Sequence, residues 1–274
     1  MSRIPCSSCG KPTEPVARFC LFCGSALSSS EKDLENSGSE SAPATPHSRS
    51  SAPYLLKLDA QKISTAWGRL IRLNPDGTDG AIFPLVGQTV KVGRGADHLC
   101  FPEDKTLADV EFELSYDGKE PRLVPAQMSL NGTFIQIRSA TQIADGDQIR
   151  VGQQLFEFEF RAPMPKTKTT IPLGRAQGLK YWGRLRQRLG PTTDANVFLL
   201  DQPSMKIGRS DGSIVIDDDP FLSSQHAQIR WDGEHCILED LKSSNGTFLR
   251  MGNSVVLRNE DRFIAGQHVF KFHL

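Results

Sequence analysis

Four cysteines near the N-terminus have the type and spacing of a metal site. Cys6 and Cys9 form one CxxC pair, and Cys20 and Cys23 form a second. Four thiolates suit the tetrahedral coordination of a structural Zn²⁺ ion, and such a site leaves no open position for catalysis. The pattern therefore predicts zinc bound by these four cysteines. A redox-active CxxC pair and free thiols are the alternatives.

This cysteine segment resembles the small zinc ribbons that begin many bacterial regulatory proteins, on the pattern CxxCG followed by RFCxxCG. The loop between the two pairs is shorter than in the commonest four-cysteine arrangement. The resemblance implies a separate module, residues 1–27. Because this module has few apolar residues, we expect the metal to supply most of its stability.

A second set of residues that could do chemistry lies near the C-terminus in three separated blocks. The blocks are Gly208-Arg209, Ser223-Ser224-Gln225-His226 and Ser243-Ser244-Asn245-Gly246-Thr247. A phosphorylated side chain carries about −1.5 to −2 charges, so its receptor needs a cation and several neutral donors. Singly, these residues have ordinary explanations, such as a surface arginine, an Asn-Gly turn and a buried structural histidine. Only the whole set indicates a function.

The three blocks, together with Lys206-Ile207 and Glu239-Asp240-Leu241, resemble a forkhead-associated (FHA) domain over nearly all of residues 179–274. The resemblance implies a β-sandwich that binds phosphothreonine peptides. It implies five peptide-binding residues: Arg209, Ser223, Ser224, Ser244 and Asn245. Four others are implied to support them: Gly208, His226, Gly246 and Thr247.

The resemblance also implies a role for each of the binding residues. Arg209 would grip the phosphate through two hydrogen bonds, Ser223 would donate its hydroxyl to the phosphate, and Ser244 would lie at its edge. Asn245 would hold the peptide backbone beside the modified threonine, and Ser224 would contact that backbone as well. His226 would brace the loops from behind, while the two glycines allow turns that a Cβ would obstruct.

The elements that must position these residues occur twice in the chain. Trp67-Gly68-Arg69-Leu70 recurs as Trp182-Gly183-Arg184-Leu185, and Asn131-Gly132-Thr133-Phe134 recurs as Asn245-Gly246-Thr247-Phe248. Inside each repeat, short alternating runs separated by Gly, Asp, Asn and Pro are typical of strands. We therefore predict a mostly β fold, with two tandem antiparallel β-sandwich (FHA/SMAD-like) domains at 64–162 and 179–274. A disordered Ser/Ala/Pro-rich linker, 28–63, would precede them and a second linker, 163–178, would join them.

The first repeat departs from the pattern of the second. Aligning the repeats places Ala108 against Ser223, Asp109 against Ser224, Glu111 against His226 and Leu130 against Ser244, whereas Arg94 and Asn131 are retained. A pocket that has lost hydroxyls and gained carboxylates would repel a phosphate dianion. The first repeat is therefore predicted to keep the fold and lose the phosphothreonine site. It could instead bind a partner independently of phosphorylation or pack against the second domain.

The overall composition excludes several classes of function. With 32 Lys and Arg against 32 Asp and Glu, the formal net charge is zero, so no general attraction to nucleic acid or anionic membrane exists. There is no run of about 18 apolar residues and no secretory signal, so we expect a cytoplasmic protein without a membrane segment. No nucleophile is paired with a base, and no glycine loop has the context of a nucleotide site, so an enzyme is not expected.

The sequence therefore predicts a non-catalytic adaptor that binds phosphothreonine-containing proteins, such as Ser/Thr kinase substrates or a kinase. The first alternative is a phosphate-independent structural or assembly scaffold. The second is a zinc-ribbon nucleic-acid binder, because seven basic residues and no acidic one lie between Lys166 and Arg188. A further hypothesis is self-binding, in which a phosphorylated linker threonine occupies the pocket. The candidates are Thr45, Thr167, Thr169 and Thr170.

Overall fold

The computed structural model describes residues 4–5, 12–13, 64–161, 181–190 and 192–274. The four predicted zinc ligands and the predicted linkers 28–63 and 163–178 lie outside the described residues. In the N-terminal part, β1 (Ile4–Pro5) pairs antiparallel with β2 (Pro12–Thr13). No helix in the described part of the chain has the length and apolar character needed to span a membrane.

The regular elements of the remaining described residues are β-strands joined by turns and loops, which confirms the predicted mostly β fold class. The strands of the first repeat are β3 (Gly68–Leu73), β4 (Asp79–Leu85), β5 (Thr89–Gly93), β6 (Leu99–Cys100), β7 (Phe112–Tyr116), β8 (Pro121–Pro125), β9 (Thr133–Gln136), β10 (Thr141–Ile143), β11 (Gln148–Val151) and β12 (Gln154–Phe160). Those of the second repeat are β13 (Gly183–Arg188), β14 (Asp194–Leu200), β15 (Ser204–Gly208), β16 (Ile214–Val215), β17 (Ala227–Trp231), β18 (Cys236–Asp240), β19 (Thr247–Arg250), β20 (Val255–Val256), β21 (Arg262–Ala265) and β22 (His268–His273).

These strands form one long sheet and two shorter sheets. The ten-stranded sheet has the order β14-β13-β12-β11-β19-β9-β21-β22-β3-β4. The five-stranded sheets have the orders β20-β8-β7-β5-β6 and β10-β18-β17-β15-β16. Pairing is antiparallel except for β5 with β6 and β15 with β16, which are parallel. Each five-stranded sheet faces one half of the long sheet, so the described residues 64–161, 181–190 and 192–274 form two sandwiches.

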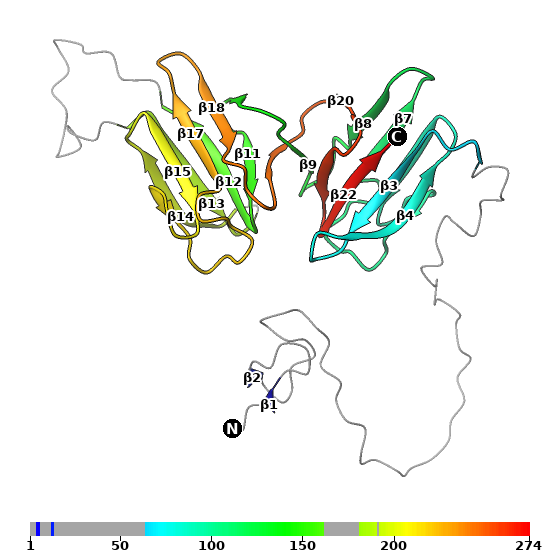
Figure 1. The fold of residues 1–274 in the computed structure, drawn as a ribbon, viewed down its shortest axis with the longest axis horizontal. Coiled ribbons are helices and arrows are strands. Elements are labelled where there is room, and N and C mark those ends of the chain that lie inside the picture. The colour runs from blue at the N-terminus through cyan, green and yellow to red at the C-terminus, as the bar shows by residue number, and fades with distance from the viewer. Residues whose placement is uncertain (1–3, 6–11, 14–63, 162–180, 191) are drawn as a thin grey trace. The chain divides into compact units, whose positions relative to one another are not determined.

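The two repeats exchange their last three strands. In the first sandwich, β22 pairs with β3 and β20 pairs with β8, so residues 255–273 complete the fold of the first repeat. In the second sandwich, β12 pairs with β13 and β10 pairs with β18, so residues 141–160 complete the fold of the second repeat. Figure 1 shows the red C-terminal strand β22 beside the cyan strand β3. We call β3–β9 with β20–β22 the first lobe, and β13–β19 with β10–β12 the second lobe.

This exchange corrects the contiguous domain boundaries 64–162 and 179–274 that the sequence predicts. The repeat itself is real, but each lobe takes strands from both repeats. The physical reason is that the last strand of each repeat offers the same buried side chains, so either can complete a lobe. Phe156 and Phe158 of β12 match Phe270 and Phe272 of β22, and all four rings are fully buried.

Each lobe has its own apolar core, and a third cluster joins them. The core of the first lobe includes Phe112, against which Phe263 and Phe270 pack edge to face with ring centroids 5.1 and 5.6 Å away. In the second lobe, the rings of Trp182 and Trp231 stack with centroids 6.1 Å apart. The third cluster lies on the opposite face of the long sheet and contains Phe134, Phe248 and Ile264, with Leu155 and Val269 packed against it.

A buried aspartate of each lobe holds the hairpin that the other repeat supplies. Asp104 accepts the backbone N–H of Gln267 at 2.9 Å, and Asp219 accepts that of Gln153 at 2.8 Å. Burial by itself would raise the pKa of Asp104, but hydrogen bonds from Gln267 and Thr106 outweigh it, so the pKa lies below its ordinary value. Both exchanged hairpins are thus anchored to their receiving lobe by a carboxylate.

Phe134→Ala should lower the free energy of unfolding by about 3–5 kcal/mol, because the ring is buried between strands of both repeats. Chemical denaturation of the full chain measures this change. Ile82→Ala is the matched control, since Ile82 is 45% exposed and should change stability by about 0.5 kcal/mol or less. Equal effects of the two substitutions would contradict the joint core.

Candidate functional site

Three loops at one end of the second lobe enclose a hollow of about 320 Å³. The loops follow β15, precede β17 and precede β19, so each begins or ends at a strand that fixes its position. All five residues predicted to bind a phosphopeptide line this hollow, which is bordered by Arg209, Pro220, Phe221, Leu222, Ser223, Ser224, Ser244 and Asn245. Pro220, Phe221 and Leu222 are not among the residues predicted from the sequence. Their position directly before Ser223 is the only signal that could have identified them.

Arg209 is the cation of the hollow. Its side chain is exposed, and no hydrogen bond or ion pair to its guanidinium is found among the described residues. Its backbone N–H donates to the carbonyl oxygen of Ser223 at 2.9 Å, which holds the arginine against the serine loop. A Cβ at Gly208 would collide with the carbonyl oxygen of Ser224, so only glycine permits this approach. The guanidinium therefore keeps its five donors for a ligand.

Ser223 and Asn245 connect the loops to one another. The Ser223 hydroxyl oxygen accepts the backbone N–H of Ser244 at 3.1 Å, which leaves its proton to donate elsewhere. The side-chain amide of Asn245 donates to the carbonyl oxygen of Phe221 at 2.8 Å. That amide has a second N–H and an oxygen with which to bond a peptide backbone. Ser224 and Ser244 are exposed on the rim.

His226 braces these loops from a fully buried position. Its Nδ1 accepts the backbone N–H of Ser223 at 3.2 Å, and its Nε2 lies 3.0 Å from the carbonyl oxygen of Gly246. An amide can only donate and a carbonyl can only accept, so these contacts fit the neutral ring with the proton on Nε2. The ring thus links the loop of Ser223 to the loop of Asn245.

Asp240 and Ser243 form a second brace that was not predicted as part of the site. Asp240 accepts the Ser243 hydroxyl and the Thr247 hydroxyl, both at 2.7 Å. The Ser243 hydroxyl oxygen in turn accepts the N–H of Gly246 at 2.9 Å. Gly246 has a φ of +84°, a conformation that favours glycine. A Cβ there would also collide with the side-chain amide of Gln136 from the first repeat.

The corresponding loops of the first lobe have different chemistry. Arg94 occupies the position of Arg209, but its guanidinium pairs with Asp109 at 3.0 Å. The fully buried Glu111 replaces His226 and accepts the N–H of Ala108 at 2.9 Å and the hydroxyl of Ser129 at 2.7 Å. Glu111 therefore still connects the loops, but Arg94 is paired with a carboxylate instead of being available to a ligand. This geometry supports the prediction that the first repeat keeps the fold without the phosphate site.

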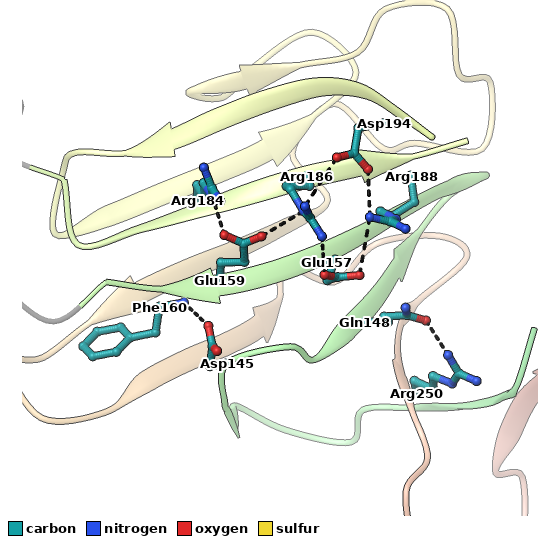
Figure 2. A network of polar contacts seen from close by, with 10 residues as sticks. All are labelled: Asp145, Gln148, Glu157, Glu159, Phe160, Arg184, Arg186, Arg188, Asp194 and Arg250. Atoms are coloured by element: carbon teal, nitrogen blue, oxygen red, sulfur yellow. Dashed lines mark hydrogen bonds and ion pairs between the residues drawn. The ribbon is translucent and has the colours of Figure 1, made fainter. Parts of the chain in front are cut away.

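The basic run that suggested nucleic-acid binding is neutralised where the structure describes it. Figure 2 shows the guanidinium groups of β13 directed at carboxylates of β12 and β14. Arg184 pairs with Glu159, and Arg186 lies 2.6 Å from Glu157 and 2.9 Å from Glu159. Arg188 lies 2.9 Å from Asp194. Three of the seven basic residues are thus paired, which argues against an open basic patch on this face.

No cluster of three or more metal-ligating side chains occurs among the described residues. Because the four N-terminal cysteines lie outside those residues, zinc binding stays a prediction. Cys6 and Cys9 fall between the paired strands β1 and β2 in the sequence.

Comparison with known proteins gives a family match inside the second repeat. The FHA domain family matches residues 205–266. The FHA domain-containing protein FhaB of Mycobacterium tuberculosis is 40% identical over 22% of this chain and 38% of its own length. The glycogen accumulation regulator GarA of Mycolicibacterium smegmatis is 36% identical over 28% of this chain and 50% of its own.

A third relative is matched over more of its length. The oxoglutarate dehydrogenase inhibitor of Corynebacterium efficiens is 36% identical over 39% of this chain and 70% of its own length. The chain spans at most half the length of FhaB and GarA.

His226→Ala should leave the Ser223 N–H and the Gly246 carbonyl without partners in a buried position. We expect the free energy of unfolding to fall by about 2–4 kcal/mol. Thermal and urea denaturation check this. His235→Ala is the control, because that side chain is 42% exposed and should have an effect within about 0.5 kcal/mol. A His226→Ala variant as stable as the control would show that the ring does not brace the loops.

The purified full chain should contain about one zinc ion per molecule, measured by elemental analysis. Paired substitution Cys20→Ser with Cys23→Ser should abolish this content, because two ligands of four are lost. Cys100→Ser should leave it unchanged, since that cysteine lies outside the CxxC pattern. Zinc retained after loss of both ligands, or absent from the parent chain, would exclude the predicted site.

Proposed function

The chain belongs to the FHA domain-containing proteins, and on that premise we propose that it is a non-catalytic adaptor that binds phosphothreonine peptides at the hollow of the second lobe. Arg209 binds the phosphate, with Ser223 as a hydroxyl donor and Ser244 at its edge. Asn245 and Ser224 hold the peptide backbone. Gly208, His226, Gly246 and Thr247 keep the three loops in place.

The observation that carries this proposal is the contrast between two equivalent arginines. Arg94 pairs with Asp109, whereas no partner of the Arg209 guanidinium is found among the described residues. An exposed planar cation beside three serine hydroxyls supplies the donors that a phosphate dianion requires. In the first lobe, the carboxylate of Asp109 lies beside the equivalent arginine and would repel the dianion.

The partners in this proposal are phosphothreonine-containing proteins, either substrates of a Ser/Thr kinase or the kinase itself. Self-binding through a phosphorylated Thr45, Thr167, Thr169 or Thr170 is a variant of the same function. The zinc ribbon and the first lobe would add contacts or structure. Relatives such as the oxoglutarate dehydrogenase inhibitor of Corynebacterium efficiens support a regulatory rather than a catalytic role. A phosphate-independent scaffold remains the rival function.

Arg209→Ala in the full chain should weaken binding of a degenerate phosphothreonine peptide library by about tenfold to a hundredfold. Hydrogen bonds to a charged group contribute about 1.5–3 kcal/mol, which corresponds to this range. Fluorescence anisotropy of the selected peptides gives the dissociation constants. Arg94→Ala is the matched control and should leave the affinity unchanged, because that arginine is already paired.

Unphosphorylated peptides of the same sequences provide the second control and should not bind. If both forms bound equally, or if neither bound, the phosphate-independent scaffold would become the better description. An equal loss in the Arg94→Ala variant would place a phosphate site in the first lobe instead.

A further inference from the structure

We propose that the first repeat is an obligate structural partner of the site in the second lobe, and that charge pairing selects the exchanged strands over a contiguous arrangement. In the contiguous arrangement, each repeat would use its own last three strands, so β22 would pair with β13 and β12 with β3. The proposal gives the degenerate first repeat a function that does not require it to bind any ligand.

Apolar packing does not distinguish the last strand of one repeat from that of the other. The buried residues of these two strands are the same, with Phe156 and Phe158 in β12 and Phe270 and Phe272 in β22. They also meet their neighbours in the same register, since Phe158 lies opposite Leu185 and Phe272 lies opposite Leu70. The preceding strands differ inside, since Ile149 and Val151 of β11 correspond to Phe263 and Ala265 of β21. The outward-facing residues of β12 and β22 differ, so selection between these two strands must come from them.

On the outer face, β12 is acidic and β22 is basic. The exchange places Glu157 opposite Arg186 and Glu159 opposite Arg184, and both carboxylates form ion pairs with these arginines (Figure 2). The four charged side chains are between 19% and 33% exposed. Partial burial limits their screening by salt.

A contiguous arrangement would replace these ion pairs with like charges. The repeat alignment places Lys271 at the position of Glu157 and His273 at the position of Glu159. In the register of β12 with β13, Lys271 would lie directly opposite Arg186, and like charges directly opposite each other destabilise a sheet. In the observed fold, Lys271 lies opposite Ile71 and pairs with Asp79 at 2.6 Å.

A second contact, at the centre of the long sheet, independently favours the exchanged arrangement on electrostatic grounds. Arg250 of β19 donates to the side-chain oxygen of Gln148 on β11 at 2.9 Å, as Figure 2 shows. The counterpart of Gln148 in the second repeat is Arg262. A contiguous pairing of β19 with β21 would therefore set Arg262 opposite Arg250. Two separate parts of the sheet thus favour the exchange for the same electrostatic reason.

Residues of the first repeat also support the loops of the site directly. A Cβ at Gly152, in the turn between β11 and β12, would lie 2.8 Å from a carboxylate oxygen of Asp219 and 3.1 Å from Leu222. This turn therefore packs against the loop that leads to Ser223. On the other loop, the N–H of Ile137 donates to the carbonyl oxygen of Thr247 at 2.9 Å. Without the first repeat, the loop before Ser223 and the loop before Thr247 would lose these contacts.

The decisive experiment cuts the chain between the repeats. A protease site is inserted between residues 163 and 178 of the full chain, and the cleaved protein is run on size exclusion under native conditions. We expect the two fragments to elute together at the mass of the uncut chain and to separate only in denaturant. Fragments that separate in native buffer and each unfold cooperatively would overturn the proposal.

Peptide binding provides the second arm. After separation in denaturant and refolding, the fragment that begins at residue 179 should fail to bind phosphothreonine peptide, and addition of the N-terminal fragment should restore binding. Binding by this fragment alone, as tight as that of the full chain, would contradict the inference. The peptide-binding experiment rests on the proposed function, whereas the co-elution experiment does not. If the uncut chain bound no phosphopeptide, only the proposed function would be rejected.

Charge reversal tests the selection itself. Glu157→Lys with Glu159→Lys in the cut chain should weaken the association of the fragments at least tenfold, and Arg184→Glu with Arg186→Glu added in the other fragment should restore it. Titration of one labelled fragment with the other measures both. Lys105→Glu with Lys119→Glu is the control, because neither lysine has a place in the exchanged sheet. If the arginine substitutions did not restore the association that the glutamate substitutions weaken, charge would not select the exchange.

Discussion

In the centre of the ten-stranded sheet, β19 pairs with β11 on one side and with β9 on the other, and β9 pairs in turn with β21. A strand inside a sheet satisfies its backbone N–H and C=O groups only through both neighbours. The loop of Asn245 leads directly into β19, and the loop of Asn131 leads directly into β9. The corresponding loops of both lobes therefore depend on hydrogen bonds that cross from one repeat to the other.

The same scaffold supports two different surfaces at its loops. In the second lobe, a buried neutral histidine connects the loops and the arginine is exposed beside serine hydroxyls. In the first lobe, a buried glutamate performs the bracing through Ala108 and Ser129, and Asp109 neutralises the arginine. The fold is preserved in both, so the chemistry of the site is set by a few loop side chains rather than by the sandwich.

The two faces of the long sheet have separate physical roles. The inward-facing phenylalanines of β12 and β22 bury apolar surface and are the same in both repeats, so they do not distinguish a contiguous from an exchanged arrangement. The outward-facing Glu157 and Glu159 match the arginines of β13, which Lys271 and His273 would not. Apolar burial thus makes each lobe stable, while charge on the outer face decides which repeat supplies the last strands.

The sequence by itself determined the mostly β fold, the internal repeat and the residues around the hollow, because short alternating strands and loop motifs are local patterns. Arg209, Ser223 and Asn245 come together as predicted, since each lies next to a strand end whose place in the fold is fixed. The sequence did not determine which repeat completes which lobe, nor that Phe221 lines the hollow. Only the tertiary structure decided these points, because the two repeats present the same buried pattern. Which of two equivalent strands is paired depends on charges that meet only after residues far apart in the chain have come together.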